Sequence, residues 1–137
     1  MWVRGERLTR KELQQIYYIN REIQMWQNEL AKLRARQLVG SPRLSDMPKG
    51  GLITGMDDYV ADLADLEATI KGLLAKLQIK RKEIMEYIFN IDDEFIRQIV
   101  YLRNVCLMSW NEVADSIGGG NTENSVKQAY SRFLKNI

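Results

Sequence analysis

Two stretches of regularly spaced apolar residues, separated by one segment rich in glycine and proline, constrain the fold of this 137-residue chain most strongly. In each stretch the apolar side chains recur alternately every three and four residues. This is the heptad pattern of a helix that packs along a partner helix. The seam residues are Ile16, Ile19, Ile23, Trp26, Leu30 and Leu33 in the first stretch, and Leu63, Leu66, Ile70, Leu73 and Leu77 in the second.

Local start and stop signals place these two helices along the chain. Thr9 and Glu12 have the spacing of a capping box, so the first helix is predicted over about residues 9–38. An aspartate at 57 or 58 can cap the second helix, predicted over about 57–90. Both prolines of the chain lie in the predicted linker, residues 39–56. The two helices predict an antiparallel hairpin. The pattern leaves open whether the seams pair within one chain or between chains.

The last third of the chain predicts three shorter helices. Acidic residues open the first helix, and Ser109 with Glu112 forms a second capping box that opens the next. Gly118 and the two glycines after it end that helix. Asn121 or Thr122 can cap the last helix, predicted over residues 123–135. Its predicted inner face comprises Val126, Ala129, Tyr130, Phe133 and Ile137.

Two short helices joined by a turn form the helix-turn-helix arrangement. The small residue Ala114 permits close approach of the second helix, and Gly118 lies four residues later, where the backbone turns. Val126 follows Gly118 by eight residues, two more than in the common pattern, so the predicted turn is longer. The chain is therefore predicted to be all-α, with a helical hairpin at 1–91 and a helix-turn-helix domain at 92–137.

Residues 103–114 and 125–134 resemble region 4 of sigma-70-type factors, a helical module that reads the −35 promoter element. The layout of the whole chain is similar to the RinA and ArpU types of phage and prophage late-gene regulators. The resemblance implies a DNA-binding regulator of transcription that contacts promoter DNA and RNA polymerase. It also implies that Arg103 lies at the DNA backbone.

The last predicted helix carries suitable side chains for reading DNA on its outward face. Residues in its first turns approach base edges when such a helix enters the major groove, and Asn, Gln and Lys can bond to purine edges. The predicted base-reading residues are Asn124, Ser125, Lys127 and Gln128. The predicted phosphate contacts are Thr122, Ser131, Arg132 and Lys135, together with Arg103.

The charge distribution bears on how strongly this module binds DNA. The whole chain has a net charge of +2, and residues 91–137 contain five basic and six acidic residues. Residues 118–137 contain three basic residues and one acidic residue, while residues 1–50 contain ten basic and five acidic residues. Because phosphate neutralisation supplies most non-specific affinity, the isolated module is expected to bind weakly. We therefore expect a homo-oligomer, with a dimer favoured, or binding together with RNA polymerase.

Composition argues against other classes of function. The chain has no histidine and one cysteine, which removes histidine-dependent catalysis and cysteine zinc cages. An enzyme is therefore the class that these residues favour least, and no metal or cofactor site is predicted. Cys106 is predicted to be a small buried residue, and Trp110 to pack on the preceding helix. No apolar run is long enough to span a bilayer, so the chain is predicted to be cytoplasmic and associated with the nucleoid of a bacterial host.

Two other interpretations remain at this point. A phage DNA-packaging subunit of the small-terminase type also joins a helix-turn-helix to helical oligomerisation elements. It would form rings of eight or more subunits. A protein-binding module with a sigma-like fold would use the same helices without binding DNA.

Overall fold

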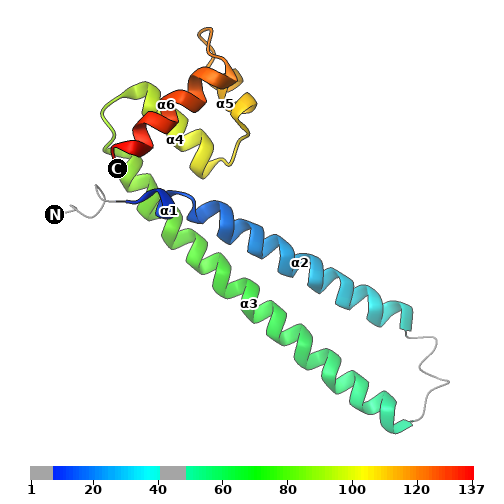
Figure 1. Cartoon of the computed structure of the whole chain (residues 1–137). Coiled ribbons are helices and arrows are strands. Elements are labelled where there is room, and N and C mark those ends of the chain that lie inside the picture. Colours follow the sequence, from blue (N-terminus) through cyan, green and yellow to red (C-terminus); the bar gives the residue numbers. More distant parts are fainter. Residues whose placement is uncertain (1–7, 41–48) are drawn as a thin grey trace. The chain divides into compact units, whose positions relative to one another are not determined.

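The computed structural model describes residues 8–40 and 49–137, and side chains are described for residues 8–36 and 58–137. All regular elements in these described residues are helices, so the predicted all-α class is confirmed (Figure 1). The described residues form two compact units. One unit consists of residues 8–19 together with Leu77–Ile137, and the other of Asn20–Lys76.

The first helical stretch begins where the sequence predicts. The Thr9 hydroxyl accepts a hydrogen bond from the Glu12 N–H at 3.2 Å, and the Thr9 N–H donates to the Glu12 carboxylate at 2.9 Å. This capping box opens α1, Arg10–Leu13, and α2 follows at Gln15–Gly40. One helix is predicted here, but Gln14, with ψ near −2°, interrupts the regular geometry for one residue.

The second long helix, α3, covers Lys49–Phe89, so the predicted start at residue 57 is wrong by eight residues. The predicted linker 39–56 is too long for the same reason. The backbone of α3 continues through Gly50, Gly51 and Gly55. A glycine costs a helix only about 1 kcal/mol and keeps its N–H, whereas only proline removes the donor. The glycines were therefore weaker stop signals than the sequence prediction assumed.

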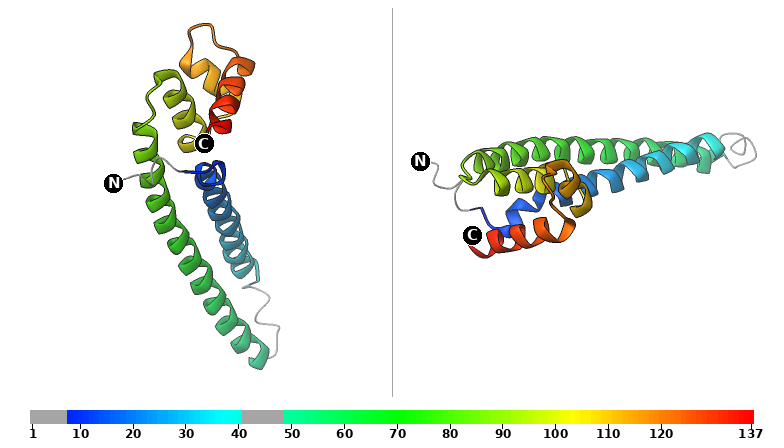
Figure 2. Two further views of the ribbon diagram at one scale, coloured as in Figure 1. Left: turned by 60° about the vertical axis from the view of Figure 1, so that its left-hand side comes forward. Right: turned by 90° about the horizontal axis from the view of Figure 1, so that it is seen from above.

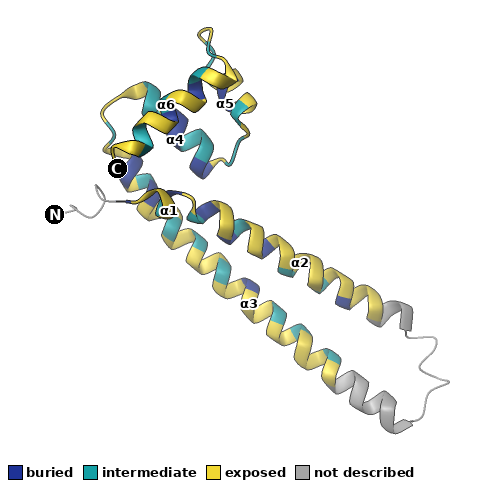
Figure 3. Ribbon diagram, in the orientation of Figure 1, coloured by how far each residue is buried: buried dark blue, intermediate teal, exposed yellow. Residues whose placement is uncertain are grey.

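In the unit Asn20–Lys76, the segments of α2 and α3 run antiparallel (Figures 1 and 2). The apolar seams of the two segments face each other, and their residues Ile23, Leu33 and Ile70 are buried. The remaining seam residues of this unit are half-buried: Trp26, Leu30, Leu63, Leu66 and Leu73. Arg34 and Glu67 pair between the two helices at 2.8 Å. The predicted hairpin seam is thus confirmed in this unit, while most other side chains of both helices are exposed (Figure 3).

The other unit contains four further elements in its C-terminal part. These are α4, Glu94–Val100; a π-helix, Tyr101–Val105; α5, Trp110–Ile117; and α6, Glu123–Lys135. They agree with the three helices predicted after residue 92. Their shared core contains Ile99, Val100, Val113 and Val126, each 0% exposed.

The division into compact units differs from the predicted boundary at 91/92. Leu13 and Ile16, from the start of the chain, and Ile84 and Ile88, from the end of α3, belong to the same core as α4, α5 and α6. Ile16 and Leu77, two predicted seam residues, therefore pack against this core. The heptad pattern gives the inward face of a helix but does not say what covers that face.

Two predicted core residues are in fact exposed. Cys106 lies at the end of the π-helix, where its N–H donates to the Tyr101 carbonyl at 3.1 Å, and its side chain is exposed. The wider π turn changes which residues face inward, and the sequence pattern does not predict a π-helix here. Ile137 is 41% exposed because it follows the last residue of α6 and lies outside that helix's repeat.

Candidate nucleic-acid interface

Helix α5, a glycine turn and helix α6 form the predicted helix-turn-helix. Ser109 and Glu112 make the predicted capping box at the start of α5, with bonds of 2.8 and 3.2 Å. The helix ends at Ile117, and all three residues that follow, Gly118–Gly120, have positive φ, between 63° and 79°. Glycine adopts this backbone conformation at little cost, which explains the glycine run. The Asn121 N–H and side-chain amide both donate to the Gly118 carbonyl, at 3.1 and 2.9 Å, and close the turn.

Helix α6 has one buried face and one exposed polar face. Val126 and Tyr130 are buried, and Ala129 and Phe133 are half-buried, so this part of the predicted inner face is confirmed. The exposed side carries six of the predicted DNA-contacting residues: Asn124, Lys127, Gln128, Ser131, Arg132 and Lys135. The structure therefore brings these six together on one helix and leaves them accessible.

Asn124, Lys127 and Gln128 form a strip in the first half of α6, because residues three and four positions apart are neighbours on a helix surface. The Lys127 ammonium lies 4.0 Å from the Glu123 carboxylate, and both side chains are about half-exposed. A pair with this exposure is weak and leaves Lys127 free to exchange one anionic partner for another.

Ser125 and Thr122, also predicted to contact DNA, build the start of α6. The Thr122 side chain accepts from the Ser125 N–H at 3.1 Å, and the Ser125 hydroxyl accepts from the Thr122 N–H at 2.9 Å. The Ser125 hydroxyl also donates within the same turn, with the Asn121 side-chain oxygen at 3.1 Å. Ser125 is thus a half-buried capping residue, and its base-reading role stays a prediction. The Thr–x–x–Ser spacing of these two residues is the feature of the sequence that could have predicted their capping role.

Arg103, predicted to contact phosphate, is engaged inside its own unit. One terminal nitrogen donates to the Met108 carbonyl at 2.8 Å. Its guanidinium lies 4.4 Å from the centre of the Trp110 ring, and that ring packs edge-on against Tyr130 at 5.0 Å. Trp110 therefore packs on neighbouring elements as predicted, and Arg103 helps to hold the loop before α5.

A buried polar pair links the π-helix to α6, and sequence reasoning did not find it. Asn104, 4% exposed, has its amide 2.9–3.0 Å from the Tyr130 hydroxyl. Desolvation by burial raises the pKa of Tyr130 to about 12, although the charges of Arg103 and Arg10 act in the opposite direction. The available signal in the sequence was an asparagine, next to Arg103, within a stretch whose other residues, 99–102 and 105–108, are hydrophobic. This pair orients the inner face of α6.

The acidic residues of the C-terminal part lie mainly outside the exposed face of α6. Asp93 caps α4, where its carboxylate accepts from the Ile96 N–H at 3.0 Å. Only Glu123 is acidic within α6, against Lys127, Arg132 and Lys135. The exposed face of α6 is therefore cationic although residues 91–137 together are not.

Comparisons of the chain with protein-family models, with curated proteins and with solved structures find no match. Within residues 8–40 and 49–137, no three acidic or cysteine side chains gather in a way that could hold a metal ion. No helix in this part of the chain is long and apolar enough to cross a membrane. The resemblance to sigma region 4 therefore stays a prediction based on residues 103–114 and 125–134.

Proposed function

We propose that this chain is a sequence-specific DNA-binding regulator of transcription, encoded by a phage or prophage, in which α6 reads base edges in the major groove. The observation that carries the proposal is the exposed strip Asn124, Lys127 and Gln128 on the second helix of a helix-turn-helix. Amides bond bidentately to adenine and lysine bonds to guanine acceptors, so this strip has the chemistry to discriminate bases.

Further along the same face, Arg132 and Lys135 are placed to contact phosphates in this proposal. Contacts to phosphate fix the position of the helix but carry no sequence information. The two groups of residues should therefore respond differently to mutation, and this difference provides the sharpest test.

The test begins with duplexes that the chain itself enriches from a random pool, followed by fluorescence anisotropy against enriched and scrambled duplexes. Lys127→Ala with Gln128→Ala should remove about 2–6 kcal/mol of discrimination between enriched and scrambled duplexes, since each good base contact contributes about 1–3 kcal/mol. The matched control replaces the exposed Gln78 and Lys82 on α3 by alanine and removes the same chemical groups. Retained selectivity in the Lys127/Gln128 variant would exclude α6 as the reading helix.

Arg132→Ala should weaken binding to enriched and scrambled duplexes by a similar factor. It should also reduce the slope of log K against log salt concentration by about one. A loss confined to the enriched duplex would instead assign Arg132 to base reading.

The proposal includes a homodimer, with RNA polymerase as a second protein partner. The low net charge of the module supports binding through two copies, because a second linked contact raises overall affinity. Sedimentation equilibrium should give about twice the 16.0 kDa chain mass. A ring of eight or more subunits would favour a DNA-packaging role. Retained polymerase binding without any DNA binding at low salt would favour a protein-binding module.

A further inference from the structure

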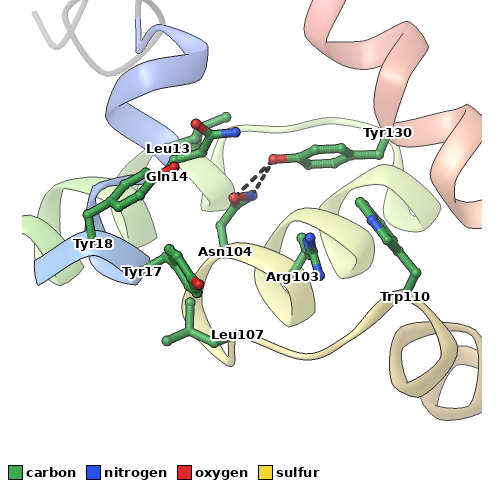
Figure 4. A pocket seen from close by; sticks show the side chains of 9 residues that line it. All are labelled: Leu13, Gln14, Tyr17, Tyr18, Arg103, Asn104, Leu107, Trp110 and Tyr130. Atoms are coloured by element: carbon green, nitrogen blue, oxygen red, sulfur yellow. Dashed lines mark hydrogen bonds between the residues drawn. The ribbon is translucent and has the colours of Figure 1, made fainter. Parts of the chain in front are cut away.

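A pocket of about 570 Å³ lies in the unit formed by residues 8–19 and Leu77–Ile137, and the strip residues Asn124, Lys127 and Gln128 are not among its described lining residues (Figure 4). Its volume is within the range of small-molecule sites, which is about 300–1,000 Å³. Four aromatic side chains contribute to its walls: Tyr17, Tyr18, Trp110 and Tyr130. Tyr17 and Tyr18 come from the start of α2, and Tyr130 comes from α6 (Figure 4).

The backbone at this pocket is unusual in two places. Arg103 and Asn104 lie on the π-helix, a rare form that is frequent at functional sites. Leu107, another lining residue, has a φ of +59° and is the only residue other than glycine with positive φ in the described residues. A branched side chain in this conformation costs about 1–3 kcal/mol, and such strain concentrates at ligand-binding sites. Both features therefore occur at residues that line the pocket.

The polar groups in the pocket have hydrogen-bonding capacity beyond their contacts within the protein. The guanidinium of Arg103 has five N–H donors, and its one hydrogen bond among the described residues goes from Nη1 to the Met108 carbonyl. Asn104, which is 96% buried, has its side-chain amide bonded to the Tyr130 hydroxyl and to no other described residue. A carboxamide can donate two hydrogen bonds and accept more than one. A ligand could therefore use donors from both Arg103 and Asn104.

The charges at the pocket select the sign of a ligand. Among the described residues that line it, Arg103 is the single charged residue and none is acidic. The guanidinium of Arg103 is a planar fork of N–H donors that can bind a carboxylate through two hydrogen bonds, and its contact with the Trp110 ring, at 4.4 Å, holds it in place.

From these observations we propose that this pocket binds a small planar aromatic carboxylate, with its ring between the aromatic walls and its carboxylate on Arg103 and Asn104. Apolar walls around a few placed polar groups are the usual composition of small-molecule sites. The proposal concerns a ligand site and does not rest on DNA binding, so each can fail without the other.

The test uses the full chain, labelled with ¹⁵N, and titrates it with 2-naphthoate at neutral pH. The Trp110 indole and Asn104 amide signals should shift and saturate, with a dissociation constant below about 1 mM, as ligand efficiency allows for a compound of this size. The matched probe is 2-naphthalenemethanol, which keeps the rings but lacks the charge. It should bind at least about tenfold more weakly, because a charge-assisted bidentate contact contributes more than 1.4 kcal/mol.

Variants locate the site. Arg103→Met should weaken 2-naphthoate binding at least about tenfold, while Arg132→Met, which removes an exposed arginine elsewhere, should leave it unchanged. Because Arg103 also holds the loop before α5, circular dichroism must show that the variant is folded. Tyr18→Ala provides a second test, since Tyr18 is 63% exposed and its loss should leave the fold intact. Its matched control is Phe89→Ala, an aromatic residue that is 69% exposed and outside the pocket.

A several-fold loss of affinity in Tyr18→Ala, with none in Phe89→Ala, would support the site even if Arg103→Met does not fold. The proposal is overturned if 2-naphthoate causes no saturable shift up to about 10 mM, or if the alcohol binds equally well. Unchanged affinity in a folded Arg103→Met variant, or in Tyr18→Ala, would overturn it as well.

Discussion

Ile99 in one unit and Ile70 in the other are the same residue type on the inward face of a helix, yet they lie in different surroundings. Ile99 is 0% exposed and belongs to a core shared by α1, the end of α3, α4, α5 and α6. Ile70 is 8% exposed and lies between two helices whose other seam residues are mostly half-buried. One neighbouring helix covers the apolar face of a helix only in part, whereas several converging helices can enclose it completely. Stability should therefore concentrate in the unit that contains α4, α5 and α6.

The largest expected effect tests this comparison directly. Ile99→Ala should lower the free energy of unfolding by about 2–5 kcal/mol, because it leaves a closed cavity. Ile70→Ala should cost about 1–2 kcal/mol, since water and neighbouring side chains can fill the space. Urea unfolding followed by circular dichroism, with amide exchange to assign each loss to a unit, measures both. Equal losses would mean that the two units are equally well packed.

Alkaline pH should selectively weaken the unit that holds Tyr130. Its folded pKa of about 12 exceeds the ordinary value of about 10, so the folded state keeps a proton that the unfolded state loses between these values. The resulting contribution of Tyr130 to the free energy of unfolding is fully present below pH 10 and is lost as the pH rises towards 12. It amounts to about 2–3 kcal/mol.

Urea unfolding from pH 8 to pH 12 should thus show a steeper loss in the natural chain than in Tyr130→Phe. The comparison with this variant is needed because burial also raises the pKa of Tyr87. Parallel pH profiles for the two chains would show that Tyr130 does not carry the effect.

Replacing glycine by alanine should change the free energy of unfolding in opposite directions at two positions, one in each unit. Gly118 has a φ of +69° and a ψ of −146°, so Gly118→Ala should cost about 1–3 kcal/mol. Gly72 lies inside α3, and a Cβ there would meet no atom within 4 Å, so Gly72→Ala should stabilise the chain by about 0.5–1 kcal/mol. Thermal unfolding should show a lower midpoint for the first variant and a higher one for the second. A stabilised Gly118→Ala would contradict the assigned turn geometry.

The smallest effect concerns the ion pair between Arg34 and Glu67. Both side chains are about half-exposed, so a double-mutant cycle with Arg34→Met and Glu67→Gln should give a coupling energy of about 0.2–1 kcal/mol. The coupling should nearly vanish in about 1 M salt because of screening. The Lys127–Glu123 pair, at 4.0 Å, serves as a weaker reference within one helix. A coupling energy that persists in about 1 M salt would show that ions screen this pair less than the exposure of its two side chains indicates.

Local signals predicted much of the fold because the interactions behind them span only a few residues. The capping boxes at Thr9 and Ser109 form between positions three apart and occur where predicted. The start and end of α5 and α6 followed in the same way. The start of α3 was predicted too late because glycine weakens a helix without blocking it.

The candidate site was predictable only in part. An exposed face on α6 follows from its apolar repeat, which correctly placed Asn124, Lys127 and Gln128 outside. The involvement of Ser125 in capping and of Arg103 in a stack on Trp110 depends on competing partners that become available only in the fold. A polar residue has several partners within reach, and a sequence pattern does not rank them.

The sequence by itself determined that the chain is helical, where most helices begin and end, and which face of each helix is apolar. These properties follow from backbone hydrogen bonding and from a repeat of 3.6 residues, both of which are local. Only the tertiary structure decided that Leu13 and Ile84 share a core with Val113 and that Asn104 bonds to Tyr130. Such contacts join residues far apart in the chain, and their free energy depends on how completely the surrounding helices exclude water.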